Sequence, residues 1–557
     1  MSKWKVWCLV LLLLLLGIGV TLFVILWQPK CARGSYLHGA VAADTEICSE
    51  IGSAILQRNG SAVDAAIAAL ICTSVLNPQS MGLGGGVIFT IYNASTGEVV
   101  VINARETAPE NITQDLLDQC NGYLQVGSQW IAVPGELRGY EEAHKRYGRL
   151  PWKALFEPTI KLLRSGIRIP IMLGRFLNHG QLKSLLKRSS LCKLFCKGDD
   201  VLKAGEILHW PALLKTLETV AETGARDFYE GKIARDLVND IQNRSGILTL
   251  NDLKNFQPIV TTSLNISLGR YTMYSPPPPA GGAILLFILN ILQGFKFTPE
   301  SMESTTGKIE TYHRIAEAVK FGNGQKSKQN DPLFLRNEQV GIQTLLSSSF
   351  AEHVRKRIDD RGDHLASFYN LSHPGITSYG TAHVSVLAED GSAVSVTSTI
   401  NYPFGSMVYS PATGIILNNE LVDFCNKKPR DKIAGGERPP SAMAPSILLS
   451  KDDNSKLVIG GSGGDQIISA TALAIMNKLW FGYDLTHAIS LPILYVSRNN
   501  SIQFEPGFDE AVKMGLLNKG HHEVTGLSLN VVQGISKEGT CIFAYSDHRK
   551  MGNSAGY

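Results

Sequence analysis

Two hydroxyl-bearing residues of this chain have neighbours that suit nucleophilic catalysis. The first is Ser462, in a Gly-Gly-Ser-Gly-Gly run at 460–464 between a predicted strand and a predicted helix. This matches the G-x-S-x-G turn that exposes the nucleophile of serine hydrolases. The same glycines could instead offer backbone N–H groups to an oxyanion. Residues that could complete a Ser–Asp–His order downstream are Asp484, Asp509, His521, His522 and His548.

The second candidate nucleophile is Thr381, which follows Gly380 at the head of a predicted strand. A neighbouring strand carries further hydroxyl groups at Thr397, Ser398 and Thr399. If the chain were cut before Thr381, the new α-amine, with a reference pKa of about 7.7–8.0, could act as the base for the threonine hydroxyl. A nucleophile activated in this way needs no distant histidine.

Residues 81–86 form another glycine-rich run, Met-Gly-Leu-Gly-Gly-Gly. Val87 occupies the position of the third glycine in a dinucleotide-binding fingerprint. The run also follows a predicted helix and precedes a predicted strand, the reverse of the order in a Rossmann unit. We therefore interpret it as a place where backbones pack closely, and not as a cofactor site.

The elements around both candidates are predicted to be antiparallel strands packed on helices. An Asp-Gly turn separates two alternating segments, 383–388 and 393–400, which is a strong β-hairpin signal. A further strand, 455–459, leads through the Ser-containing glycine run into a helix over 466–480, and 426–440 is a polar loop. Antiparallel pairing argues against a serine elbow, which tops a parallel sheet.

The first half of the chain is predicted to be rich in helices, the first of them over 49–76. The tetraproline segment 275–282 is expected to be an extended surface connector that leads into an apolar helix over 283–292. Strands and helices in this mixture indicate a layered α+β fold. The other predicted elements are strands at 87–92 and 99–102 and helices at 136–147, 160–164 and 212–223.

Residues 6–27 carry no charge and are long enough, at about 1.5 Å per residue, to cross a hydrocarbon core of about 30 Å. No small-x-small cleavage signal follows before Pro29. Trp7 and Trp27 lie near the two ends, where interfacial aromatics are expected. We interpret the segment as one transmembrane helix, an uncleaved signal anchor after a cytoplasmic tail of residues 1–5, with a cleaved signal peptide as the weaker alternative.

Sequons beyond the anchor indicate that the rest of the chain is extracellular, which describes a single-pass type II protein of the plasma membrane. An oxidising compartment favours disulfides, and Cys48 with Cys72 and Cys192 with Cys196 are the plausible pairs. The sequence leaves open the pairing of Cys31, Cys120, Cys425 and Cys541. The N-glycosylation acceptors are Asn59, Asn93, Asn111, Asn243, Asn265, Asn370 and Asn499.

Composition narrows the class of protein. The chain has 557 residues, 44% of them hydrophobic, and is therefore globular. Its 53 Lys and Arg against 49 Asp and Glu leave a formal net charge of +4, which does not indicate a nucleic-acid-binding surface. No further Cys or His flanks Cys192 and Cys196 at ligand spacing, so no metal site is expected.

Several motifs, in order along the chain, resemble the γ-glutamyltransferase family. The resemblance extends from about residue 42 to residue 557, and residues 275–282 and 407–410 are most similar to the γ-glutamyl leukotrienase branch. The motifs are NPQSMGLGGG at 77–86, NARE at 103–106, TAHVSV at 381–386, TSTIN at 397–401, NNE at 418–420 and SAGY at 554–557.

The resemblance implies a four-layer αββα sandwich of the N-terminal-nucleophile hydrolase type. It also implies that the proenzyme cleaves itself between Gly380 and Thr381. The products would be a large subunit, residues 28–380 beyond the anchor, and a small catalytic subunit, residues 381–557, which stay associated as a heterodimer.

The resemblance also assigns roles in catalysis. Thr381 would form a γ-glutamyl-enzyme, Thr399 would orient its hydroxyl, and Gly463 and Gly464 would form the oxyanion hole. No metal and no organic cofactor is implied.

A γ-glutamyl group keeps a free α-carboxylate and a free α-ammonium, so its site needs charges of both signs. Arg105 suits the carboxylate because a guanidinium can bind it in a two-pronged fork. Asn401, Glu420 and Asp423 suit the ammonium. Gly464 would also contact the substrate.

The chain departs from the family where members often carry Ser-Ser-Met before a proline. Here Ser441 keeps its hydroxyl, but Ala442 can offer only its backbone N–H. We expect both residues to contact the substrate, with a changed affinity and no loss of activity.

The expected function is an extracellular γ-glutamyl hydrolase and transferase. Its substrates would be glutathione, glutathione conjugates and leukotriene C4, with water, amino acids or dipeptides as acceptors, and no nucleic acid. An alternative of another class is an inactive, membrane-anchored adhesion protein, supported by the Arg361-Gly362-Asp363 triplet and the sequons. A serine hydrolase that uses Ser462 is the third hypothesis.

Overall fold

A computed structural model describes most of the chain. Among the described residues, no helix is both long and apolar enough to cross a membrane. The predicted tail 1–5 and anchor 6–27 lie almost wholly outside the described part, so the anchor stays a prediction. The described residues are Trp4, Trp7, Leu13, Gly17, Cys31 and the segments 34–120, 125–326, 329–334, 338–371, 380–426, 432–526 and 531–557.

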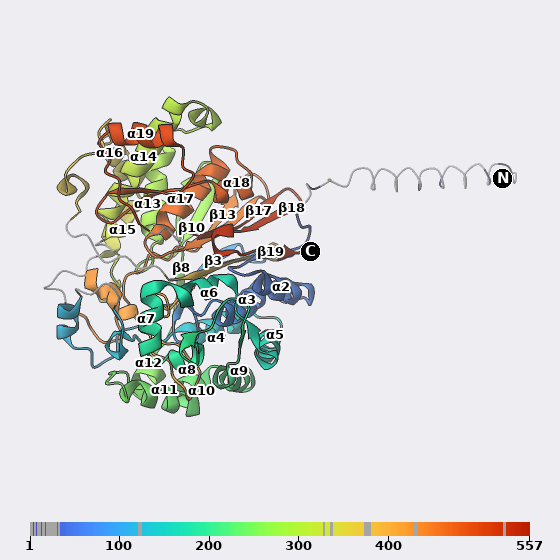
Figure 1. Cartoon of the computed structure of the whole chain (residues 1–557). Coiled ribbons are helices and arrows are strands. Elements are labelled where there is room, and N and C mark those ends of the chain that lie inside the picture. The colour runs from blue at the N-terminus through green and yellow to red at the C-terminus, as the bar shows by residue number, and fades with distance from the viewer. Residues whose placement is uncertain are drawn as a thin grey trace.

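Two large antiparallel sheets form the centre of the molecule (Figure 1). The first has seven strands, in the order β19 (Ser554–Gly556), β1 (Ala40–Ala42), β11 (Ala382–Leu387), β12 (Ala393–Thr399), β2 (Gly86–Asn93), β3 (Glu98–Ala104) and β8 (Ile259–Thr262). The second has six strands, in the order β18 (Cys541–Ser546), β17 (Val531–Glu538), β14 (Lys456–Ser462), β13 (Ser446–Ser450), β10 (Tyr271–Ser275) and β9 (Leu264–Leu268).

The two sheets pack face to face, since β11 and β12 both contact β14. Helices cover their outer faces, so the order of layers is helix, sheet, sheet, helix, as the αββα prediction requires (Figure 1). On the seven-stranded sheet lie α2 (Glu46–Gln57), α3 (Ala62–Leu76) and α4 (Glu136–Tyr147). On the six-stranded sheet lie α13 (Gly282–Gln293), α17 (Gln466–Leu479) and α18 (Leu485–Ser490).

Further helices extend the two outer layers (Figure 1). Beyond the seven-stranded sheet are α5 (Trp152–Ser165), α6 (Ile171–Asn178), α7 (Gly180–Arg188), α8 (Cys192–Phe195), α9 (Pro211–Thr223), α10 (Arg226–Glu230), α11 (Lys232–Gln242) and α12 (Leu250–Asn255). Beyond the six-stranded sheet are α14 (Thr305–Asn323), α15 (Glu338–Leu346), α16 (Ser348–Arg355) and α19 (Glu510–Asn518). Three small ribbons pair β4 (Ile167–Arg168) with β7 (Ile207–Leu208), β5 (Cys196–Lys197) with β6 (Asp200–Val201), and β15 (Leu494–Val496) with β16 (Ile502–Phe504).

Strand β11 has different chemistry on its two faces. Ala382, Val384 and Val386 belong to the apolar core on the helix side of the sheet. His383 and Ser385 point the other way, because the His383 ring lies against Gly460 of β14 and Ser385 Oγ donates to Gln533 O of β17 at 3.2 Å. Since side chains alternate along a strand, Thr381 shares the inter-sheet face.

Most predicted elements are confirmed, including the 383–400 hairpin, but the single helix over 49–76 is wrong. The chain breaks it into α2 and α3 between Arg58 and Ser61. Asn59 has a left-handed φ of 61°, and Ser61 caps α3 in a capping box with Asp64. The Asn-Gly-Ser sequence at this point is a typical break signal.

The tetraproline segment 275–282 is not a surface connector as predicted. It is largely buried beside residues 441–443. Pro279 O accepts the N–H of Ser441 at 2.7 Å, and Gly281 N–H donates to Met443 O at 2.8 Å. The segment therefore supports a loop that the sequence links to substrate binding.

Four disulfides are present among the described residues. They include the pairs that the sequence favoured, Cys48–Cys72 and Cys192–Cys196. The remaining four cysteines pair as Cys31–Cys541 and Cys120–Cys425. Both of these join a residue before Gly380 to a residue after Thr381.

These two cross-links predict that the fragments stay covalently joined after a cut between Gly380 and Thr381. The cleaved wild type should run as one band on a denaturing gel without reductant and as two bands with it. The double variant Cys31→Ser, Cys120→Ser should give two bands without reductant. The control Cys48→Ser, Cys72→Ser should still give one, and separation of unreduced wild-type fragments would contradict the pairing.

Candidate active site

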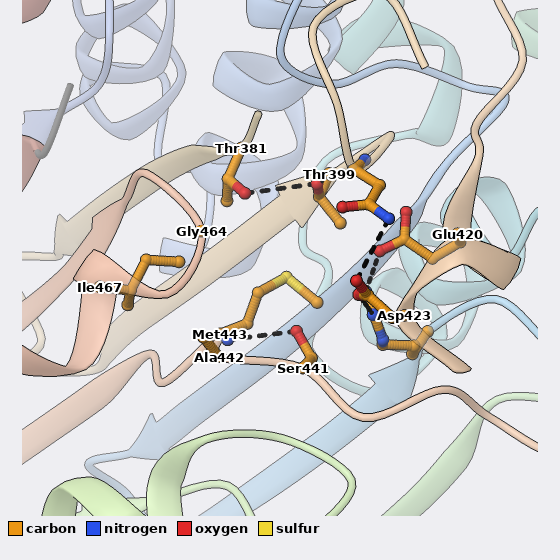
Figure 2. A pocket seen from close by; sticks show the side chains of 11 residues that line it. Thr381, Thr399, Glu420, Asp423, Ser441, Ala442, Met443, Gly464 and Ile467 are labelled. Carbon is orange, nitrogen blue, oxygen red and sulfur yellow. Dashed lines mark hydrogen bonds and ion pairs between the residues drawn. The ribbon is translucent and has the colours of Figure 1, made fainter. Parts of the chain in front are cut away.

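Thr381 lies at the head of β11 and is buried, with 4% of its surface exposed. Its hydroxyl contacts the carbonyl oxygen of Gly380, in the peptide bond just before it. The hydroxyl also donates to Thr399 Oγ1 at 3.3 Å (Figure 2). Thr399 Oγ1 accepts the N–H of Asn401 at 2.8 Å. The threonine hydroxyl is therefore positioned against the carbonyl of its own preceding peptide bond.

Glycines let the backbones around Thr399 approach closely. A Cβ at Gly85 would lie 2.0 Å from Thr399 O, and one at Gly84 would lie 2.1 Å from Ile416 O. A Cβ at Gly380 would lie 2.2 Å from Asn401 O. The glycine run at 81–86 thus packs tightly against other backbone segments, as predicted from the sequence, and the structure shows that one of them is the end of β12.

A small pocket, partly open to solvent, lies beside Thr381 between the ends of the two sheets (Figure 2). All of the predicted catalytic and substrate-binding residues except Gly463 line it. The sequence did not predict two apolar lining residues, Met443 and Ile467, whose types carry no chemical signal. The complete lining is Arg105, Thr381, Thr399, Asn401, Glu420, Asp423, Ser441, Ala442, Met443, Gly464 and Ile467.

Gly463 and Gly464 connect β14 to α17. Their φ values of 115° and 60° lie in the region that favours glycine. Their carbonyls accept the N–H groups of Gln466 and Ile467 as α17 begins. Among the described residues, neither glycine N–H has a hydrogen-bond acceptor, so both can donate to an anion at this helix start.

Comparison with known proteins identifies the family of this chain. The family profile described as Gamma-glutamyltranspeptidase matches residues 48–557. The chain belongs to the γ-glutamyltranspeptidase family. This membership confirms the prediction, made from the Thr381 and NARE motifs, of an enzyme of this class.

The relatives are similar over nearly their whole length. The glutathione hydrolase 5 proenzyme of Rattus norvegicus is 53% identical, over 99% of this chain and 98% of its own. The Homo sapiens protein of the same name is 52% identical, over 95% and 94%. A cephalosporin acylase from Bacillus halodurans, at 24% identity, shares the fold with a TM-score of 0.83 over 95% of this chain and 98% of its own.

The candidate site contains a fully buried guanidinium, that of Arg105, on the loop that follows β3. It forms ion pairs with Glu420 through Nη1 and with Asp423 Oδ2 through Nη2 at 2.6 Å. Its Nε donates to Pro439 O and its Nη2 to Pro440 O, both at 3.0 Å. The residues predicted to bind substrate charges of opposite sign therefore bind one another in this structure.

Burial and charge together set the protonation of this cluster. Burial disfavours the Arg105 cation, but Glu420 and Asp423 outweigh it and raise the Arg105 pKa. Burial raises the pKa of Glu420 to about 7, although Arg105 opposes the rise. Burial and the Glu420 charge raise the pKa of Glu106 well above its usual range, and neither Glu106 oxygen has a hydrogen-bond partner among the described residues. The raised pKa favours the neutral, protonated form of the Glu106 carboxyl.

Ser462 is not arranged as a serine nucleophile. It ends an antiparallel strand, and its buried hydroxyl accepts from Lys550 Nζ at 2.9 Å. His521 lies instead in a polar cluster with His313, and among the described residues no histidine is bonded to Ser462. The predicted serine elbow therefore lacks its base.

The Arg361-Gly362-Asp363 triplet is a closed turn. Arg361 Nε pairs with Asp363 Oδ1 at 3.1 Å, and Gly362 is buried beneath the His521 ring. Both charged ends of the triplet thus bind each other, which does not favour the adhesion hypothesis.

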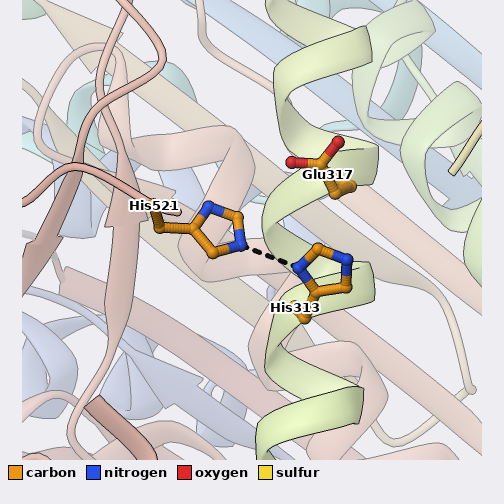
Figure 3. Close-up of side chains that lie close together, drawn as sticks. All are labelled: His313, Glu317 and His521. Atoms are coloured by element: carbon orange, nitrogen blue, oxygen red, sulfur yellow. Dashed lines mark hydrogen bonds between the residues drawn. The ribbon is translucent and has the colours of Figure 1, made fainter. Parts of the chain in front are cut away.

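His313, Glu317 and His521 lie close enough to suggest a metal site (Figure 3). Lys320 Nζ, which can only donate, contacts His521 Nδ1 at 2.9 Å and Glu317 Oε1 at 3.0 Å. His521 Nε2 then meets His313 Nδ1 at 2.8 Å, and His313 Nε2 meets Asp359 O, which can only accept, at 2.6 Å. Each hydrogen bond in this chain runs from Lys320 toward Asp359, so the one acceptor nitrogen of each neutral histidine ring already accepts a hydrogen bond. No ring nitrogen is left to bind a metal ion, and the cluster therefore suits two neutral histidines and a lysine.

This cluster predicts a loss of stability in acid. Burial, assisted by Lys320, lowers the pKa of His521 to about 2, whereas an unfolded histidine titrates near 6.5. The unfolded chain therefore binds more protons below pH 6.5, and the free energy of unfolding should fall by up to about 1.4 kcal/mol per pH unit as the pH drops. Thermal midpoints at pH 7.5 and 5.5 test this.

In His521→Gln, the midpoint at pH 7.5 should be lower than in the wild type, but its further loss at pH 5.5 should be smaller. The matched control is His522→Gln, because His522 is exposed and adjacent. An equal acid loss in His521→Gln and the wild type would contradict the prediction.

Proposed function

We propose that this chain is a γ-glutamyl hydrolase and transferase that cleaves itself before Thr381 and then uses Thr381 as its nucleophile. The observation that carries the proposal is the contact of the Thr381 hydroxyl with the Gly380 carbonyl beside a cavity that holds Arg105, Glu420 and Asp423. Its relatives are named glutathione hydrolase 5 proenzymes, which supports glutathione as the substrate and a cleaved product as the active form.

In self-cleavage, Thr381 Oγ attacks the Gly380 carbonyl carbon. The C–N bond breaks, the acyl group moves from nitrogen to oxygen, and the hydroxyl proton passes to the freed nitrogen. Water then hydrolyses the ester, which leaves the Gly380 carboxylate and the free α-amine and hydroxyl of Thr381. Thr399 supports the attacking oxygen through the 3.3 Å hydrogen bond described above.

In turnover, the α-amine of Thr381 accepts the hydroxyl proton as the oxygen attacks the γ-glutamyl carbonyl. The N–H groups of Gly463 and Gly464 stabilise the oxyanion. The C–N bond breaks, the leaving amine takes the proton, and a γ-glutamyl ester remains on Thr381. Water completes hydrolysis of this ester, or an amino acid or dipeptide amine accepts the group.

The charges of the cavity suit a γ-glutamyl group. We assign the substrate α-carboxylate to Arg105 with Ser441 and the Ala442 backbone, and the α-ammonium to Asn401, Glu420 and Asp423. Binding would insert a zwitterion into an ion-pair network that is already buried, so the substrate charges replace contacts that the protein makes with itself. Glutathione conjugates and leukotriene C4 carry the same γ-glutamyl group.

The proposed location is the outer face of the plasma membrane, through a type II anchor at residues 6–27. Sequon exposure supports this location. Six of the acceptor asparagines are exposed and Asn93 is half-buried, so glycans could be attached without unfolding the chain. The exposed six are Asn59, Asn111, Asn243, Asn265, Asn370 and Asn499.

Thr381→Ala should abolish self-cleavage and lower γ-glutamyl release at least about 10³-fold, because no other group supplies the nucleophile. Thr381→Ser, which keeps the hydroxyl, should restore both. Fragment masses and γ-glutamyl release from glutathione measure the outcome. Ser462→Ala should remain cleaved and active within about tenfold; activity lost in Ser462→Ala but kept in Thr381→Ala would overturn the proposal.

Ala442→Ser should add a hydroxyl donor to the proposed carboxylate site. A charge-assisted hydrogen bond of about 1.5–3 kcal/mol should lower KM for glutathione by roughly 10- to 150-fold with little change in kcat. Steady-state kinetics with Ala511→Ser, on an exposed helix position, provide the control. An unchanged or higher KM would indicate that the substrate α-carboxylate does not bind beside residue 442.

A further inference from the structure

Lys550 is a buried cation that contacts the nucleophile residue. It lies in the short 3-10 turn η7 (His548–Lys550), between β18 and β19, and is 7% exposed. Its Nζ donates to Thr381 O at 2.5 Å, to Asp44 Oδ2 at 2.7 Å and to Ser462 Oγ at 2.9 Å. An ammonium has three donors, so all of its hydrogen-bonding capacity is used at this point.

The Lys550 position is fixed by segments from both proposed subunits. Asp44 follows β1, and its Oδ1 accepts from Gln533 Nε2 of β17. Gln533 Oε1 in turn accepts the N–H of Asp547 at 3.0 Å. The three acceptors therefore come from separate parts of the chain, and the ammonium holds them together.

We propose that Lys550 is a positioning residue that fixes the Thr381 carbonyl and, in the cleaved enzyme, keeps the Thr381 α-amine unprotonated at neutral pH. This rests on the proposed function, since the amine exists only after cleavage. The α-nitrogen and the carbonyl carbon of Thr381 share one Cα, so the Lys550 charge lies on the order of 5 Å from the amine. A like charge at that distance disfavours the ammonium form.

Lowering the pKa of this amine would matter for the rate. A free α-amine titrates at about 7.7–8.0, so more than half of it would be protonated and unable to act as a base at pH 7.4. A shift of about one unit downward would leave most of it available.

Other charged groups face the same region, and they are already compensated. Asp44 offsets part of the Lys550 charge through its ion pair. Burial and the Lys550 charge lower the pKa of His383 to about 3, so its ring is neutral. Across the cavity, Arg105 is paired with Glu420 and Asp423, and Asp465 is paired with both Arg498 and Lys326. Among the described residues, Lys550 is the cation that is hydrogen-bonded to Thr381.

The geometry around Lys550 suits a lysine better than an arginine. Its three acceptors surround a single point, which suits a compact ammonium with three donors. A guanidinium is planar and wider, so Arg would keep the charge while displacing the Thr381 carbonyl. Substitutions of Lys550 can therefore test the effect of its charge separately from the effect of its position.

The test uses the full chain and measures fragment masses and the pH profile of kcat/KM for γ-glutamyl release from glutathione. Lys550→Met keeps the side-chain length and removes the charge. The pKa of the Thr381 α-amine should then rise, and the acidic limb of the kcat/KM profile should move up by about one pH unit. Lys550→Arg should keep the wild-type limb with a lower kcat. Lys153→Met, at an exposed ion pair with Glu222, is the control and should match the wild type.

A cleaved and active Lys550→Met with the wild-type acidic limb would overturn the inference while leaving the proposed function intact. A wild type that neither cleaves nor releases the γ-glutamyl group would overturn the proposed function itself. If Lys550→Met fails to fold or to cleave, the variant Asp44→Asn provides the test. Without Asp44 the Lys550 charge is uncompensated, so the acidic limb of the pH profile should move to lower pH. An acidic limb that is unchanged or moves to higher pH would overturn the inference.

Discussion

The register between β11 and β12 is the constraint on which the rest of the site depends. Ala382 pairs with Ser398, which brings the hydroxyls of Thr381 and Thr399 to 3.3 Å from each other. Because side chains alternate along a strand, a slip of one residue would turn the Thr381 side away from the space between the sheets. Gly380, before β11, lets the chain pass close to Asn401 O, just beyond β12, and Gly85 does the same against Thr399 O on the other side of β12.

A second constraint is the burial of charge at the same edge of the sheets. Arg105 and Lys550 are both almost inaccessible to solvent. Arg105 is paired with Glu420 and Asp423, Lys550 is paired with Asp44, and both also donate to backbone carbonyl groups. Removing one partner of such a pair leaves an uncompensated buried charge, which is strongly destabilising. The site is therefore polar and also rigid. The proposed substrate binding at Arg105 and the proposed amine chemistry at Thr381 would both use groups that the protein already holds through ion pairs or hydrogen bonds.

Much of the fold could be predicted from local patterns, and the failures have local causes too. The 383–400 hairpin follows from alternation around an Asp-Gly turn, and helix 466–480 follows from its apolar spacing. The 49–76 helix fails because apolar periodicity continues across an Asn-Gly-Ser break. Segment 275–282 fails because a proline run is compatible with both a surface and a buried position. Only the loop that packs on it, residues 441–443, decides between the two.

The sequence by itself determined the nucleophile candidate, the family motifs and the residue types that suit a γ-glutamyl group, because each of these is contained in a short run of neighbours. Tertiary structure alone decided that Arg105 binds Glu420 and Asp423, and that Lys550 binds the Thr381 carbonyl, 169 residues before it in the chain. It also decided the disulfides that span the proposed cut. Contacts over such separations arise from the packing of one sheet on the other, and no local pattern records which side chains that packing brings together.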